Sequence, residues 1–200
     1  PAPTLGQAMF GLAVLFPAFL ILSGIPARWE SLTIAGRLAG NMVVTVLLFA
    51  VWPLVLTTIT RVSWSSGLSL RRASLGAFFS SAILGLSLWP FAYEMQVLLL
   101  STERLEALEK LFAPFKAQLD AVPLWWKLFA LAVIPAVCEE LFFRGFLLSA
   151  FRSGMSKWLA IAFTSVLFGL FHVVVQQSLF AERFVPTCFL GVVLAFLCVR

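Results

Sequence analysis

The chain has 200 residues, of which 62% are hydrophobic and only 12% are charged, and its mean hydropathy is +1.03. A soluble domain is about 45–50% apolar and about 25% charged, so the composition excludes an ordinary water-soluble fold. The formal net charge of +5 comes from Lys and Arg residues scattered between apolar runs. Because they form no basic cluster interleaved with exposed aromatics, we expect the lipid bilayer as a partner and no nucleic acid.

Six apolar runs approach or exceed the length of about 20 residues that a membrane span needs. The first four each contain an internal proline, which a membrane bundle tolerates because neighbouring helices satisfy the freed backbone groups. The sequence therefore predicts an all-α fold, a polytopic bundle of about six transmembrane helices. The runs cover about 5–26, 38–59, 75–99, 124–151, 158–175 and 184–199.

Residues 101–123 interrupt this pattern with an amphipathic segment. Its apolar residues, such as Leu105, Leu108 and Phe112, recur at helical spacing, and charged residues fill the other faces. We expect a helix that lies at the membrane surface, either as simple interfacial packing or as an element that guides the substrate. The chain is accordingly divided into generic N-terminal spans over 1–100, this segment, and a C-terminal core over 124–200.

The stretch CEELFFRG at 138–145 places three ionisable side chains, Glu139, Glu140 and Arg144, inside the fourth apolar run. A charged group at the centre of a membrane helix costs roughly 2.5–3.5 kcal/mol on insertion scales. These three groups are therefore expected to face the bundle interior or a wet cavity. On a helix, Glu140 and Arg144 lie four residues apart on one face and can form an ion pair. Such a pair also has a purely structural interpretation, in which it fixes the register of the helix.

Glu139 lies about 100° around the helix from Glu140. The residues three and four positions further on are Phe142 and Phe143, so no basic residue stands at those spacings. A carboxylate placed among aromatics inside a bundle, without such a partner, has the character of a general base. A structural ion pair alone leaves Glu139 unexplained, which favours the catalytic interpretation.

The stretch FGLFHVV at 168–174 places His172, the only histidine of the chain, in the fifth apolar run. Phe168 stands one helical turn earlier, where its ring can pack on the imidazole. Ser165 and Gly169 form a pair of small residues four apart, which allows close approach of another helix. A single histidine on an apolar helix is usually a core group whose hydrogen bonds are satisfied. His172, however, is expected to face the same bundle interior as two glutamates, which favours a functional role.

The ordered pair EELFFR at 139–144 and FGLFH at 168–172 resembles the CPBP family, the CAAX-processing and bacteriocin-processing intramembrane proteases that include Rce1-like and Abi enzymes. The resemblance covers about 124–200 and implies a protease core there. It implies that Glu139 and His172 are catalytic and activate the attacking water. It also implies that Glu140 and Arg144 support the site and that Phe168 shapes the pocket. The substrate would be a membrane-tethered peptide or protein, and the setting a bacterial plasma membrane.

The family carries a third motif, with a second histidine and an asparagine-like residue, that this chain does not contain. We expect that motif beyond Arg200, in a longer protein of which this chain is a truncated piece. The family is described both as metalloproteases and as glutamate-dependent proteases. A catalytic zinc usually has three protein ligands. We therefore expect the residues in view to require no cofactor, and keep zinc as the alternative, with Glu139 and His172 as candidate ligands.

Two non-enzymatic interpretations remain open. The same ionisable residues could form a proton or ion relay in a transporter or its accessory subunit, since buried membrane charges also perform that function. The chain could instead be a bacteriocin-immunity or scaffold protein that keeps the fold without turnover. A span with the missing histidine and asparagine after Arg200 would favour the protease, and a full phenotype without Glu139 would favour the scaffold.

Overall fold

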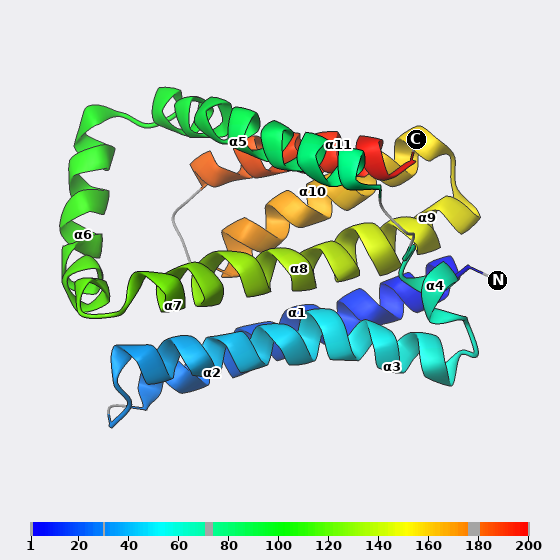
Figure 1. Ribbon diagram of the computed structural model, residues 1–200, viewed down its shortest axis with the longest axis horizontal. Helices are drawn as coiled ribbons and strands as arrows, with labels where there is room; N and C mark the ends of the chain where they lie inside the picture. Colours follow the sequence, from blue (N-terminus) through cyan, green and yellow to red (C-terminus); the bar gives the residue numbers. More distant parts are fainter. Residues whose placement is uncertain (1, 30, 71–73, 176–180, 200) are drawn as a thin grey trace.

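The computed structural model describes residues 2–29, 31–70, 74–175 and 181–199 (Figure 1). Helices make up nearly all of these ranges, and no strand occurs in them. The predicted all-α class is therefore confirmed. Successive long helices run in alternating directions, and both ends of the chain lie at the same end of the bundle (Figure 1).

The N-terminal part is an antiparallel pair of long helical rods. Helix α1 begins with a capping box, in which the Thr4 hydroxyl accepts from the Gln7 N–H while the Gln7 side chain accepts from the Thr4 N–H. The Trp52 indole N–H donates to the Gly11 carbonyl over 3.2 Å and joins the two rods. The first rod is α1 (Leu5–Arg28), and the second consists of α2 (Ile34–Val46), the π-helical η1 (Leu47–Val51) and α3 (Trp52–Ile59).

The short α4 (Trp64–Gly67) leads to α5 (Leu75–Leu98), which is followed by α6 (Thr102–Asp120). The chain bends by 113° between α5 and α6. The new direction starts at Ser101, whose hydroxyl caps α6 by accepting from the Arg104 N–H. Helix α6 consequently runs across one end of the bundle, at a steep angle to the other long helices (Figure 1).

The helical rod over residues 124–154 carries both glutamates and forms the middle of the molecule (Figure 1). Pro135 stands in the first turn of α8, directly after a π-helical segment, and Pro53 stands in the same relation to η1. A wide π turn leaves room for the proline ring and the missing N–H, so both rods continue past their prolines. The parts are α7 (Leu124–Leu128), η2 (Phe129–Val133), α8 (Ile134–Glu140), η3 (Leu141–Leu147) and α9 (Leu148–Gly154).

The last two helices, α10 (Lys157–Val175) and α11 (Ala181–Val199), pack against each other in opposite directions. Their backbones approach closely at glycines. A Cβ added to Gly191 would lie 3.0 Å from the Ser165 Cα, and one added to Gly169 would lie 3.0 Å from the Phe184 ring. The predicted role of the small residues Ser165 and Gly169 in close helix approach is therefore confirmed.

The bundle is closed by a core of buried aromatic rings at the crossing of α1, η1, η3 and α10, whose members include Phe19, Phe49, Phe142, Phe143 and Phe171. These rings meet mostly edge to face, at centroid distances between 4.9 and 6.1 Å. The core fixes η3 against α10, and so fixes the glutamates at the end of α8 relative to the histidine on α10.

The outer surface of the bundle carries many exposed large apolar side chains, as a membrane protein requires. Among the described residues, four helical stretches are long and apolar enough to cross a membrane, and a fifth if the bent pair α5 and α6 counts as one span. The predicted number of about six spans is thus approximate. The rod over 124–154 is helical throughout but stands outside this count, and it is the rod that holds Glu139, Glu140 and Arg144.

Candidate active site

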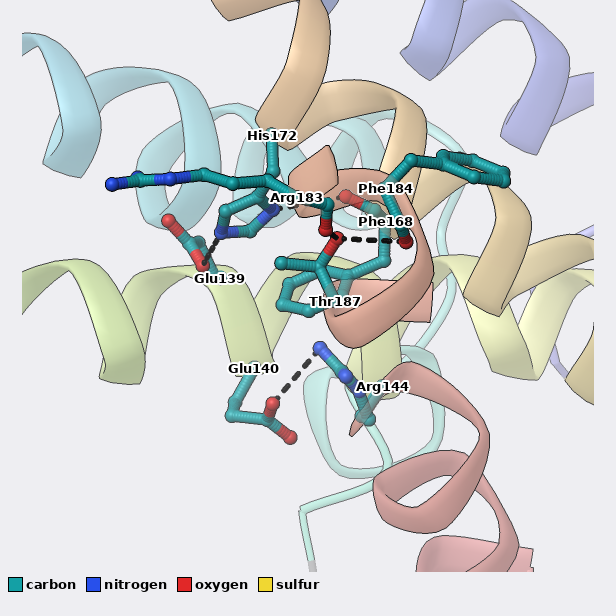
Figure 2. Close-up of polar contacts among 8 residues, drawn as sticks. All are labelled: Glu139, Glu140, Arg144, Phe168, His172, Arg183, Phe184 and Thr187. Carbon is teal, nitrogen blue, oxygen red and sulfur yellow. Dashed lines mark hydrogen bonds and ion pairs between the residues drawn. The ribbon is translucent and has the colours of Figure 1, made fainter. Parts of the chain in front are cut away.

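The five residues singled out from the sequence lie together at the contact of the 124–154 rod with α10 (Figure 2). Glu139 and Glu140 are the last two residues of α8, and Arg144 follows in η3, whereas Phe168 and His172 stand one turn apart on α10. The two glutamates point to different sides of their helix, Glu139 toward the imidazole and Glu140 toward the guanidinium (Figure 2).

Glu140 and Arg144 form the predicted ion pair, with 2.9 Å between Oε1 and Nη1. The pair is asymmetric, because the Arg144 side chain is 3% exposed and that of Glu140 is 41% exposed. The guanidinium also lies over the Phe168 ring, with Cζ 4.1 Å from the ring centroid. Arg144 is therefore held by a carboxylate of its own helix and by the face of an aromatic ring on α10.

Phe168 positions His172 in two ways. Its ring packs edge to face on the imidazole at a centroid distance of 4.5 Å, as predicted. Its backbone carbonyl lies 2.9 Å from the Nδ1 atom of His172. A carbonyl oxygen can only accept, so Nδ1 carries the hydrogen and donates it, and in the neutral ring the lone pair then sits on Nε2.

The Nε2 atom faces Glu139, whose Oε2 atom is 3.8 Å away. This separation exceeds the range of a direct N–H···O hydrogen bond, about 2.7–3.2 Å. A neutral Nε2 and an ionised carboxylate are both acceptors, so a donor placed between them would satisfy both. A water molecule about 2.8 Å from each atom can do this, because it carries two hydrogens and 3.8 Å is shorter than the sum of two such bonds.

The histidine and the ion pair border different cavities. His172 lines a cavity of about 160 Å³, together with residues of α5 and α11 that include Trp89, Tyr93 and Thr187. Glu140 and Arg144 instead line a cavity of about 350 Å³. Successive residues of a helix are rotated by about 100°, so Glu139 faces the imidazole of His172 while Glu140 faces the cavity of about 350 Å³.

Sequence reasoning missed the contributions of α5 and α11 to the site. Arg183, near the start of α11, lines the His172 cavity, and its side chain extends past the imidazole (Figure 2). The Thr187 hydroxyl donates to the Arg183 carbonyl over 2.6 Å, which steadies the first turns of α11. The only signal in the sequence is the charged pair Glu182 and Arg183 just before an apolar run.

The donor set does not complete a zinc site. Among the described residues, no three His, Cys, Asp or Glu side chains come together in a way that could hold a metal ion. Catalytic zinc usually has three protein ligands, and Glu139 and His172 provide two, while Glu140 faces Arg144. These residues alone thus do not fit a resident zinc ion.

Comparison with protein families gives a match in the C-terminal part of the chain. Residues 121–200 match the family described as type II CAAX prenyl endopeptidase Rce1-like. Neither the curated proteins nor the solved structures contain a match to the chain. The family match confirms the resemblance seen in the two motifs. The C-terminal part of this integral membrane protein therefore carries an Rce1-like domain, a domain of a family of membrane endopeptidases.

Proposed function

We propose, from the Rce1-like character of residues 121–200, that the protein is an intramembrane endopeptidase in which Glu139 and His172 activate the attacking water. The observation that carries the proposal is the pair of facing acceptors, Oε2 of Glu139 and Nε2 of His172, held 3.8 Å apart. The Nδ1–H bond to the Phe168 carbonyl fixes which imidazole nitrogen faces the carboxylate.

The chemistry follows from this placement. A water that donates one hydrogen to each acceptor has its lone pairs directed away from both, toward an incoming carbonyl carbon. As the new C–O bond forms, Glu139 takes a proton from the water, while His172 keeps the water oriented through the other hydrogen. In the tetrahedral intermediate the former carbonyl oxygen carries the displaced π electron pair. When this pair forms the C=O bond again, the C–N bond breaks, and Glu139 returns the proton to the leaving amine.

Arg144, Glu140 and Phe168 act as positioning residues in this proposal. The guanidinium is in contact with the Phe168 ring, and that ring is in contact with the imidazole. The ion pair with Glu140 holds the guanidinium in place. The orientation of His172 is therefore coupled to the ion pair through one aromatic side chain.

The proposed substrate is a membrane-tethered peptide or protein, because the site lies inside an apolar helical bundle rather than on a surface exposed to water. We assign the protease core to residues 124–200, the interfacial segment to 101–123, and the remaining spans to 1–100. A bacterial plasma membrane is the proposed location, since processing proteins of this kind are abundant in bacteria.

The test is cleavage of a membrane-tethered, fluorescently quenched peptide by the purified protein in detergent. Glu139→Gln keeps the shape of the side chain and removes the base, so turnover should be lost. The matched control is Glu106→Gln, at an exposed position of α6 that lines none of the cavities described here. Normal turnover by Glu139→Gln would contradict the proposal. Absence of turnover in the wild-type protein, with intact ion or proton transport, would favour the relay instead.

A further inference from the structure

The cavity at His172 adjoins a second cavity. The second one, of about 220 Å³, lies in the angle between α5 and α6. The two cavities share three lining residues, Tyr93, Gln96 and Arg183. The two cavities therefore lie next to each other along α5.

The three residues that the two cavities share are polar, and the rest of the lining of the second cavity is mostly apolar. Its other lining residues are Val97, Leu100, Leu105, Leu108, Glu109 and Phe112. Leu105, Leu108 and Phe112 follow each other at helical spacing on α6, and Glu109 adds one carboxylate beside them. At 220 Å³ it is smaller than the roughly 300–1,000 Å³ of pockets that take a drug-sized ligand. Its size and lining thus suit a single apolar side chain.

The angle that forms this cavity is built into the fold. The 113° bend between α5 and α6 prevents the two helices from closing on each other along their length. Arg104 of α6 lies 3.5 Å from the Glu182 carboxylate of α11, next to Arg183. This ion pair connects the start of α6 to the start of α11, the helix that borders His172. It therefore holds the second cavity next to the candidate site.

We propose that the angle between α5 and α6 is a specificity pocket that takes a large apolar side chain of the peptide substrate, next to the bond that Glu139 and His172 cleave. This inference rests on the proposed function. The substrate backbone would pass Gln96 and Arg183, whose side chains can hydrogen-bond its carbonyl groups. The pocket lies outside residues 121–200 except for Arg183, so the N-terminal part of the chain would set the specificity.

The first experiment compares two membrane-tethered peptides that differ only in carrying Phe or Ala beside the cleaved bond. The wild-type protein should prefer the Phe peptide, because apolar pockets discriminate by about 10–200-fold per missing methylene or similar group. Leu108→Trp fills the pocket, so the ratio of kcat/KM for the Phe and Ala peptides should fall about tenfold, mainly through KM. The ratio is independent of the fraction of protein that folds.

The matched control is Leu111→Trp, which adds the same ring on the same helix at a side chain that is 59% exposed and does not line the cavity. This variant should keep the wild-type ratio. An unchanged ratio in Leu108→Trp, with both peptides cleaved, would overturn the specificity pocket and leave the proposed function standing.

The second experiment needs no turnover. Glu139→Gln protein is mixed with the same peptide carrying a photoreactive diazirine on the apolar side chain, illuminated, digested and analysed by mass spectrometry. Crosslinks should map to residues 97–112 and decrease in Leu108→Trp. Crosslinks confined to other helices would overturn the inference. Crosslinks at 97–112 in a protein whose wild type cleaves neither peptide would support the pocket and contradict the peptidase function.

Discussion

The guanidinium carbon of Arg144 lies 4.1 Å from the centre of the Phe168 ring, which in turn lies 4.5 Å from the centre of the His172 imidazole. One aromatic ring thus separates a buried cation from the proposed catalytic histidine. The carbonyl of the same residue accepts the hydrogen of Nδ1. Phe168 therefore determines both where the imidazole lies and which nitrogen faces Glu139.

Phe168→Leu should reduce activity without abolishing it. The substitution keeps the backbone carbonyl but removes the ring between Arg144 and His172, and misplacing a catalytic group by about 1 Å can cost about a hundredfold. We expect turnover to fall about ten- to a hundredfold and the free energy of unfolding to fall by about 1–3 kcal/mol. The control is Phe163→Leu, on the same helix but at a residue that is 52% exposed. It should change turnover and the free energy of unfolding only slightly. Full activity in Phe168→Leu would show that the ring does not position the histidine.

The Glu140–Arg144 pair should matter more for folding than Glu139 does. Removing one partner of a buried ion pair costs about 3–5 kcal/mol, and here the buried partner is Arg144. Glu140→Ala therefore leaves a buried cation without its carboxylate, whereas Arg144→Ala leaves a half-exposed carboxylate. We expect the loss of stability to be largest for Glu140→Ala, smaller for Arg144→Ala and smallest for Glu139→Gln.

Thermal unfolding in detergent measures this order, and the double variant provides the control. If the two side chains interact, Glu140→Ala combined with Arg144→Ala should cost less than the sum of the single variants. Wild-type stability in both single variants would count against the pair as a structural element.

Packing of α10 on α11 should depend on Gly191. Its added Cβ would meet the Ser165 Cα at 3.0 Å, and backbone cannot rotate away as a side chain can. Gly191→Ala should therefore destabilise the protein by about 1–3 kcal/mol. The control is Gly24→Ala, where nothing lies within 4 Å of the added atom. There alanine should be neutral, or stabilising by up to about 1 kcal/mol through helix propensity. Equal melting temperatures for the two variants would contradict the close packing.

Local spacing made part of the site predictable from the sequence. The ion pair of Glu140 with Arg144 and the packing of Phe168 on His172 both join residues four apart, and such neighbours follow from the helical repeat alone. The cost of charge in lipid predicted that these groups point inward. The approach of Glu139 to His172 joins two helices and follows from no local rule. The cost of placing either group in lipid predicted that both face the bundle interior, and the resemblance predicted their joint role.

Other features were beyond the sequence because they depend on packing between distant segments. The π-helical segments before Pro53 and Pro135 were not predicted, since nothing in a proline reveals how the preceding turn widens. The apolar run over 75–99 and the amphipathic segment over 101–123 predict a change from span to surface helix, but not the 113° bend between them. Gln96, Arg183 and His172 line one cavity because of the way α5, α6 and α11 are arranged in space. The sequence alone does not reveal this arrangement.

Glu139 and His172 should be jointly required for peptide cleavage. In the proposed mechanism each supplies one of the two acceptors, 3.8 Å apart, that hold the attacking water, so removing either should release it. Glu139→Gln and His172→Ala should each reduce kcat to the background rate. Because groups that act as a unit are not additive, the double variant should be no worse than either single variant. Steady-state cleavage of the membrane-tethered peptide by the four proteins measures this.

The same assay separates a water held by two side chains from a metal-bound water. With the two acceptors alone, prior treatment with a chelator should leave wild-type turnover unchanged, because Glu139 and His172 supply fewer than the three protein ligands usual for catalytic zinc. Loss of turnover with chelator, restored by zinc and by no other addition, would contradict this and would require a further ligand outside the described residues. Independent, multiplicative losses in the single and double variants would contradict the joint mechanism, since each residue would then act on a separate step.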